Sequence, residues 1–263
     1  MKVAVFQMDA GEVGPQDRQA SIEAAVAEAA EEGCRIIVLP ELAISGYGAG
    51  GEIVDAAGDV SGEQVNWLKK LAREAGCALV AGLALQTAGK TCNSALFVPP
   101  DGGVVRYDKI HLYGNYEKTL FTSGRSPSPI LSFEGMTFGL LVCFDVEFPE
   151  RVRDLALRGA EAILVPTALP KSEGGAFIAR SVLPVRAFEN QVFIAYANHV
   201  GEDARFAYQG QSCIAAPDGK LLARGTPDTA RLLVADLDPT AYDACRAQNP
   251  YLEEVKRCSG FLS

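Results

Sequence analysis

Short apolar runs alternate with amphipathic stretches through the first half of the chain. Three of these runs have the length and composition of buried strands: residues 2–8, 35–40 and 77–85. Two intervening segments, 18–33 and 61–76, carry apolar residues at helical spacing and close on Gly33 and Gly76, which suit the end of a helix. Ser61 is expected to cap the second of these helices.

The second half of the chain repeats this order of elements. Its expected strands are residues 137–144, 161–166 and 191–198. Its expected helices are 149–159, with Pro149 in the first turn, and 174–190, which Pro184 should interrupt. Each half closes with a hairpin-like segment that contains an Asp-Gly turn: residues 93–109 and 211–225.

This internal repeat predicts the fold class. Two such units would form two sheets, each with helices on one face, packed sheet against sheet. We therefore expect an α/β protein built as a four-layer αββα sandwich. With 263 residues, 48% of them hydrophobic, the chain should form a single domain over residues 1–263. Residues 240–263 lie beyond the second unit and are expected to form a C-terminal arm, which either contacts a partner subunit or packs on the protein's own surface.

The charge balance disfavours several classes of partner. Lys and Arg total 24 against 33 Asp and Glu, which gives a formal net charge of −9 and a pI near 4.9. Such a surface repels phosphate backbones and anionic lipids, so we expect neither nucleic acid nor a membrane as partner. The sequence shows no signal peptide and no apolar stretch long enough to span a bilayer, which predicts a cytoplasmic protein.

The seven cysteines show no paired close spacing, and the chain has only two histidines. Reduced thiols fit this pattern better than a disulfide framework, and the usual zinc-ligand clusters cannot be assembled from it. We therefore expect no metal and no other cofactor. Four cysteines lie in or beside apolar strands and should be core residues, whereas the last two lie in the arm: Cys34, Cys77, Cys92 and Cys213, then Cys245 and Cys258.

Three chemically capable residues follow expected strands or end them: Glu41, Lys109 and Cys143. Sites in sheets covered by helices gather at the carboxyl ends of strands. Each residue alone has a simpler explanation, which is a loop acid, a solvated lysine and a packed thiol, respectively. Together they suggest nucleophilic catalysis, because a thiol attacks only as thiolate and needs a base and a cation. Neither His111 nor His199 has a partner in a recognisable cysteine-protease order, so the expected base is a carboxylate.

Several motifs resemble those of the nitrilase superfamily of carbon–nitrogen hydrolases. They are "LPELAISGY", "YDKIHL", "CFDVEFPE", "RAFENQVFIAYANHVG" and the repeated "PDG", and together they cover nearly the full chain. The resemblance implies the αββα sandwich and a triad of Glu41, Lys109 and Cys143. It also implies a second glutamate, for which "GNYEKTLFTSG" supplies Glu117. The alternative for Glu117 is an exposed loop acid.

The mechanism of that family assigns each residue a role. Cys143 would attack an amide carbonyl while Glu41 accepts the thiol proton and later passes it to the leaving ammonia. Lys109 and the backbone N–H of Phe144 would stabilise the oxyanion. Water deprotonated by Glu41 would hydrolyse the thioester, and Glu117 would position the substrate amide and the lysine. Members of the family commonly assemble, so a homodimer or larger homo-oligomer is expected.

The residues after the nucleophile favour an amidase. Nitrile-cleaving relatives typically have Trp-Glu there, whereas this chain has Phe144-Asp145, closer to the Tyr-Asp of amidase-like branches. Relatives that act on ω-amides of dicarboxylic acids carry Arg at the position of Glu147, so we expect a small aliphatic or amino-acid-type amide instead. Glu147 would favour neutral or amine-bearing amides if it faces the pocket, and otherwise it forms a structural salt bridge. Phe144, Thr167 and Ala168 are further candidates for the substrate pocket.

Other functions stay open at this point. A nitrilase would form a thioimidate with the same triad, and an N-carbamoyl hydrolase would need polar pocket groups that the sequence does not locate. A catalytically idle member could serve as a partner-binding scaffold, although all four expected residues are present. A thiol redox protein is disfavoured, because no C-x-x-C motif places a resolving cysteine near Cys143.

Overall fold

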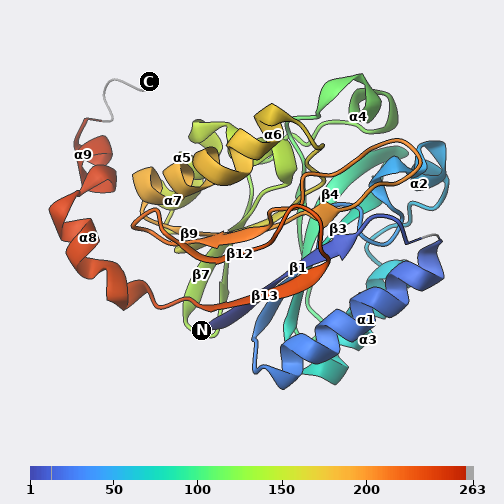
Figure 1. The fold of residues 1–263 in the computed structure, drawn as a ribbon, viewed down its shortest axis with the longest axis horizontal. Helices are drawn as coiled ribbons and strands as arrows, with labels where there is room; N and C mark the ends of the chain where they lie inside the picture. Colours follow the sequence, from blue (N-terminus) through green and yellow to red (C-terminus); the bar gives the residue numbers. More distant parts are fainter. Residues whose placement is uncertain (13, 259–263) are drawn as a thin grey trace.

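Two β-sheets pack face to face between two layers of helices in the computed structural model, which describes residues 1–12 and 14–258 (Figure 1). This is the expected αββα sandwich. The first sheet consists of β1 (Lys2–Asp9), β2 (Ile36–Val38), β3 (Ala78–Thr87), β4 (Lys90–Val98), β5 (Val105–Asp108), β10 (His199–Val200) and β13 (Arg231–Asp236). The second consists of β6 (Ile130–Phe133), β7 (Met136–Leu140), β8 (Ala162–Pro166), β9 (Phe193–Ala197), β11 (Cys213–Ala215) and β12 (Leu221–Arg224).

Four helices form the outer layers. Figure 1 shows α1 (Pro15–Glu31) and α3 (Glu63–Ala75) on one side of the paired sheets, and α5 (Pro149–Leu157) and α7 (Leu183–Asn190) on the other. The connections contain shorter helical segments: η1 (Tyr47–Ala49), α2 (Gly51–Asp55), α4 (Gly114–Leu120), η2 (Cys143–Glu147), α6 (Glu173–Phe177), η3 (Ile178–Val182), η4 (Pro239–Tyr242), α8 (Asp243–Gln248) and α9 (Tyr251–Arg257).

The internal repeat is visible in the strand pairing. β1, β2 and β3 pair in parallel and are followed by the antiparallel strands β4 and β5. In the same way, β7, β8 and β9 pair in parallel and are followed by antiparallel β11 and β12. Each set also carries an antiparallel edge strand, β13 on β1 and β6 on β7. The sequence did not predict β13 as part of the first sheet, because it reaches β1 from the far end of the chain.

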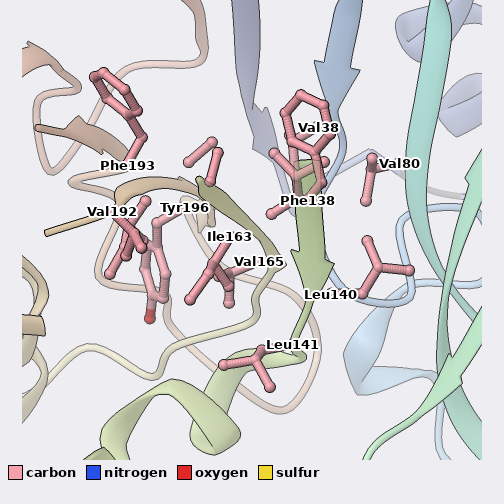
Figure 2. Packing of buried hydrophobic residues seen from close by; sticks show 14 of the residues in the cluster. Val38, Val80, Phe138, Leu140, Leu141, Ile163, Val165, Val192, Phe193 and Tyr196 are labelled. Atoms are coloured by element: carbon pink, nitrogen blue, oxygen red, sulfur yellow. The ribbon is translucent and has the colours of Figure 1, made fainter. Parts of the chain in front are cut away.

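Successive side chains along the strands of the first sheet point alternately into two hydrophobic clusters. Side chains of one parity, such as Val38 and Val80, pack against the second sheet, and those of the other parity pack under α1 and α3. Figure 2 shows Val38 and Val80 beside Phe138 and Leu140 of β7. The interface between the sheets is therefore a dry core, and it fixes how the loops at the ends of the two sheets meet.

Three local expectations differ from the structure. The strand expected over 137–144 ends at Leu140, and Cys143 begins the 3₁₀ turn η2. Ser61 does not cap α3, because its hydroxyl donates to Asp59 Oδ1 (2.6 Å) and Gly62 takes the capping position. The helix expected over 174–190 is interrupted before Pro184, by the π-helical turn η3, since proline lacks the N–H that a regular helix needs.

The expected C-terminal arm is helical as far as the structure describes it. Residues 239–257 form η4, α8 and α9, and α9 contacts α5 and α7, where the rings of Tyr251 and Phe188 lie 5.6 Å apart. Residues 259–263 of the arm lie outside the described residues. Within residues 1–12 and 14–258, no helix has the length and apolar character to cross a membrane.

Candidate active site

Glu41 lies in the loop that follows β2 and is fully buried. Its Oε1 accepts hydrogen bonds from Lys109 Nζ (2.7 Å) and Asn93 Nδ2 (2.6 Å), while its buried Oε2 has no partner among the described residues. Burial raises the pKa of Glu41 to about 7, and the Lys109 cation opposes this effect. A carboxylate with one unpaired oxygen and a pKa near neutrality is suited to act as a general base.

Lys109 directly follows β5 and is also fully buried. Its Nζ donates to Glu41 Oε1 and to Glu117 Oε1, at 2.7 and 2.6 Å. Burial alone would lower the pKa of Lys109, but the two carboxylates raise it well above its usual value, so the side chain is an ammonium. Because an ammonium has three N–H donors, one is left for a further acceptor.

Glu117, in α4, is not the exposed loop acid that the sequence left open. Its side chain is fully buried, with Oε1 accepting from Lys109 and from the Tyr47 hydroxyl (2.9 Å). Its Oε2 accepts the backbone N–H of Tyr113 (2.9 Å). These contacts fix Glu117 rigidly beside the lysine.

Cys143 comes from the second sheet, at the turn that follows β7. Its backbone φ of 46° lies in the left-handed region, which is strained for a residue with a Cβ and is typical of functional turns. The residue is 6% exposed. Burial and Glu41 raise the pKa of Cys143 well above its usual value, although Lys109 opposes them. The resting group is therefore the thiol, and a thiol becomes a nucleophile only when a base removes its proton.

The expected pocket residues differ in their surroundings. Thr167 and Ala168 are buried, and the carbonyl oxygen of Thr167 accepts the N–H of Glu41 (3.2 Å), so this segment holds the backbone of Glu41. Phe144 is half-buried and packs edge-on against Tyr113, with ring centroids 5.2 Å apart. Thr167 is therefore in contact with Glu41, and Phe144 directly follows Cys143 in the chain.

Glu147 is half-buried and its carboxylate forms no ion pair among the described residues. Arg186 donates instead to the backbone oxygens of Val146 (3.2 Å) and Glu147 (2.7 Å), and its ion pair is with Glu189. Burial raises the pKa of Glu147 to about 7, an effect that the cations Lys109 and Arg186 oppose. The salt-bridge alternative for Glu147 is therefore not what the structure shows.

Sequence reasoning missed three residues that hold the site. Asn93 on β4 donates to Glu41, Tyr47 donates to Glu117, and His199 Nε2 contacts the backbone oxygen of Glu41 (2.9 Å). All three are buried. A polar side chain within an apolar strand needs a partner, so Asn93 in "NSALF" was a signal that could have been used.

Comparison with known proteins gives the family. A family model described as carbon-nitrogen hydrolase matches residues 2–247. The chain belongs to the carbon–nitrogen hydrolase family. A solved structure of the amidase from Nesterenkonia sp. AN1 is similar to this chain, with a TM-score of 0.85 and 35% identity over 98% of this chain and 99% of that chain. This similarity supports its place in the amidase-like branch of the nitrilase superfamily.

Two relatives of this carbon–nitrogen hydrolase are a nitrilase and an amidase. A nitrilase from Pyrococcus abyssi is 34% identical over 90% of each chain, and an (R)-stereoselective amidase from a Pseudomonas species is 32% identical over 83% of this chain and 78% of that protein. Further structures, of mutants of the Nesterenkonia amidase, show acrylamide, or the acetamide moiety of fluoroacetamide, added at the active-site cysteine. Among the described residues of the present hydrolase, no group of three or more His, Cys, Asp or Glu side chains is arranged to hold a metal ion.

Proposed function

We propose that this carbon–nitrogen hydrolase is an amidase that converts a small aliphatic or amino-acid-type amide to a carboxylic acid and ammonia. The observation that carries the proposal is the buried Lys109 ammonium held between Glu41 and Glu117 next to a nucleophile turn. The similarity to an amidase whose mutants form adducts at the active-site cysteine supports a covalent route.

In the first step, Cys143 attacks the amide carbonyl carbon while Glu41 accepts the thiol proton on its unpaired Oε2. The oxyanion that forms accepts the third N–H of Lys109 and the backbone N–H of Phe144, which stabilise the developing charge. Glu41 then passes the proton to the nitrogen, ammonia leaves, and a thioester remains on Cys143.

In the second step, water attacks the thioester. Glu41 accepts a proton from this water, and the resulting tetrahedral intermediate expels the Cys143 thiolate, which regains its proton from Glu41. Glu117 holds Lys109 in place throughout and positions the substrate amide. The cycle consumes one water and needs no cofactor.

Nitrile hydrolysis is the alternative that a specific observation favours, because a relative from Pyrococcus abyssi bears the name nitrilase. The same thiol would then form a thioimidate. The experiment is ammonia release from matched panels of aliphatic amides, amino-acid amides, ω-amides, carbamoyl compounds and nitriles, with Cys143→Ala as the control. We expect release from small amides that vanishes in the variant. Release only from nitriles or carbamoyl compounds would replace the amidase proposal, and no release together with a Cys143 that resists iodoacetamide would indicate an idle scaffold.

Glu147 is proposed to select against anionic substrates. Its half-buried carboxylate lies within electrostatic range of Lys109 and has no ion-pair partner among the described residues. We expect a higher kcat/KM for an amine-bearing amide than for its carboxylate-bearing analogue at pH 8, and Glu147→Gln should reduce the ratio by about tenfold, or about 1.4 kcal/mol. A preference of the wild-type protein for the anion would contradict this role.

We also propose that the protein is cytoplasmic and forms a homo-oligomer. The absence of disulfides among its seven free cysteines and the acidic composition support the location. The exposed side chains of Phe177 (61%) and Val185 (49%), on α6 and α7, support assembly through the surface of these two helices.

A further inference from the structure

Asp145, two residues after the nucleophile, is a fully buried acid that the proposed mechanism does not use. Its Oδ1 accepts the backbone N–H of His111 (2.9 Å) and lies 2.8 Å from His111 Nδ1, while its Oδ2 accepts the hydroxyl of Tyr107 (2.9 Å). Oδ2 is also 3.4 Å from the N–H of Val142. The carboxylate thus gathers donors from two separate segments of the chain. The sequence offered His111 no partner in a recognisable cysteine-protease order, and the structure pairs it with Asp145.

The residues that donate to Asp145 lie on both sides of Lys109 in the sequence. Tyr107 lies two residues before Lys109 and His111 lies two residues after it, so Asp145 holds the lysine segment from both sides. Val142 directly precedes Cys143, and Asp145 follows it by two residues. Lys109 follows a strand of the first sheet and Cys143 follows a strand of the second. One buried carboxylate therefore bridges the two sheets at the place where cation and nucleophile must meet.

The same residue also shapes the nucleophile turn. The N–H of Asp145 donates to the carbonyl oxygen of Val142 (3.0 Å), and its own carbonyl oxygen accepts from the N–H of Phe148 (3.2 Å). The first of these bonds spans Cys143, whose left-handed backbone must be held by its surroundings, and the second continues the turn toward α5. His111 stacks on Phe148, with ring centroids 3.8 Å apart and planes at 14°, which fixes the imidazole that bonds to Asp145.

We propose that Asp145 is a positioning residue for the hydrolysis, acting through Tyr107 and His111 to hold the Lys109 ammonium in register with the Cys143 thiol. The group touches neither the substrate nor the reacting atoms. Its effect on the rate comes from geometry, since an oxyanion donor stabilises the transition state only at hydrogen-bonding distance from the oxyanion. This inference rests on the proposed hydrolytic function of the same site.

The main test replaces Asp145 by Asn, which keeps the shape but puts an NH2 group against the donors of Tyr107 or His111. We expect kcat for the best amide of the panel to fall at least 30-fold with KM changed less than threefold. Tyr107→Phe removes one hydroxyl only and should lower kcat about fivefold. In the Asp145→Asn background, Tyr107→Phe should lower kcat less than twofold further, because the bond is already broken.

A matched control separates positioning from general loss of stability. Gln7 on β1 is fully buried, and its side chain bonds to the backbones of Thr226, Thr229 and Ser212 at 2.7, 2.7 and 2.8 Å. Its strand is separated from β5 by β2, β3 and β4. Gln7→Met should lower the melting temperature while leaving kcat within twofold. A kcat loss in Asp145→Asn no larger than that of Gln7→Met would overturn the proposal.

Two further results keep the test decisive. If Asp145→Asn does not fold, Tyr107→Phe decides alone, and an unchanged kcat in that variant refutes the role of the carboxylate. If the wild-type protein hydrolyses no compound of the panel, the function proposal fails separately, and the rate of Cys143 alkylation by iodoacetamide becomes the readout. Alkylation should then slow at least fivefold in Asp145→Asn and stay unchanged in Gln7→Met, and equal rates in all three proteins would reject the positioning role.

Discussion

At the scale of single residues, the proposed chemistry depends on which groups carry a proton near pH 7. Burial raises the pKa of Glu41 to about 7 and keeps Cys143 a thiol, while two carboxylates keep Lys109 charged. The site therefore does not store a thiolate and must create it during the attack. Glu41 can accept that proton only in its ionised form.

The pH dependence of the reaction follows from this requirement. We expect kcat/KM to fall as the pH drops below about 7, because protonated Glu41 cannot act as the base. The Glu117 carboxylate contributes to the raised pKa of Glu41, so Glu117→Gln should move this acidic limb to lower pH. Glu147 also has a pKa of about 7 and serves as the control. An acidic limb that disappears in Glu147→Gln would show that the wrong carboxyl has been assigned.

His199 makes a second pH-dependent contribution, this time to stability. It is 1% exposed, and burial lowers its pKa to about 4, against about 6.5 in an unfolded chain. Between pH 6.5 and 4 the unfolded state takes up a proton that the folded state does not, so the free energy of unfolding should fall with pH, by up to about 3 kcal/mol.

The measurement is denaturant unfolding of the wild type and His199→Gln from pH 8 to pH 4. The carboxyls of Glu41 and Glu147 have raised pKa values and act in the opposite sense between about pH 4.5 and 7, but they do so in both proteins. The difference between the two proteins therefore isolates the histidine. The stability advantage of the wild type should shrink as the pH falls, and a difference that is constant with pH would refute the argument.

At the scale of elements, β3 determines where Glu41, the proposed base, lies. The N–H of Gly82 donates to the carbonyl oxygen of Pro40 (3.3 Å), and its own carbonyl oxygen accepts the N–H of Ala43 (3.2 Å), so the strand holds the loop on both sides of Glu41. A Cβ at Gly82 would lie 2.5 Å from Glu41 Cα and 2.9 Å from Leu42 N. Only glycine lets the loop approach so closely.

Gly82→Ala should therefore displace Glu41 without removing any reacting group. We expect kcat/KM to fall at least tenfold and the free energy of unfolding to fall by about 1–3 kcal/mol, the usual range for overpacking. Gly51→Ala is the control, because a Cβ at Gly51 in α2 meets nothing within 4 Å. Steady-state kinetics and thermal unfolding of both variants test this, and wild-type kinetics in Gly82→Ala would contradict it.

At the scale of the whole molecule, the proposed site exists only because two sheets dock. Glu41, Lys109 and Glu117 belong to the first half of the chain, and Cys143 belongs to the second. The packed core between the sheets, which includes Val38 opposite the residues of β7, fixes their relative position (Figure 2).

Assembly gives a prediction at the same scale. Phe177 and Val185 are large apolar side chains exposed on α6 and α7, where a partner subunit would bury them. The wild type should elute with at least twice its chain mass of 27.9 kDa, and the double variant Phe177→Glu, Val185→Glu should elute as a smaller species. Val60, exposed at 42% before α3, provides the control, and Val60→Glu should leave the mass unchanged. Light scattering coupled to gel filtration measures all three, and a monomeric wild type would refute the assembly.

The sequence by itself determined the layered architecture and the three strand-end residues. Hydrophobic periodicity depends on which face of a strand or helix is buried, and this pattern repeats in both halves, so the two sheets were predictable from local signals. Residues such as Glu41 and Cys143 were found because polar or reactive groups at strand ends are unusual within an apolar pattern, and because their motifs resemble a known family.

The tertiary structure alone decided which groups meet. The bonds of Asp145 to the segment around Lys109, of Asn93 to Glu41 and of Tyr47 to Glu117 join residues far apart in the sequence, and no periodicity encodes such pairs. The same is true of β13, which reaches β1 from the opposite end of the chain. The pKa of Glu41 is raised because its carboxyl group is completely buried away from water. This burial depends on the docking of the two sheets and not on the residues that neighbour Glu41 in the sequence.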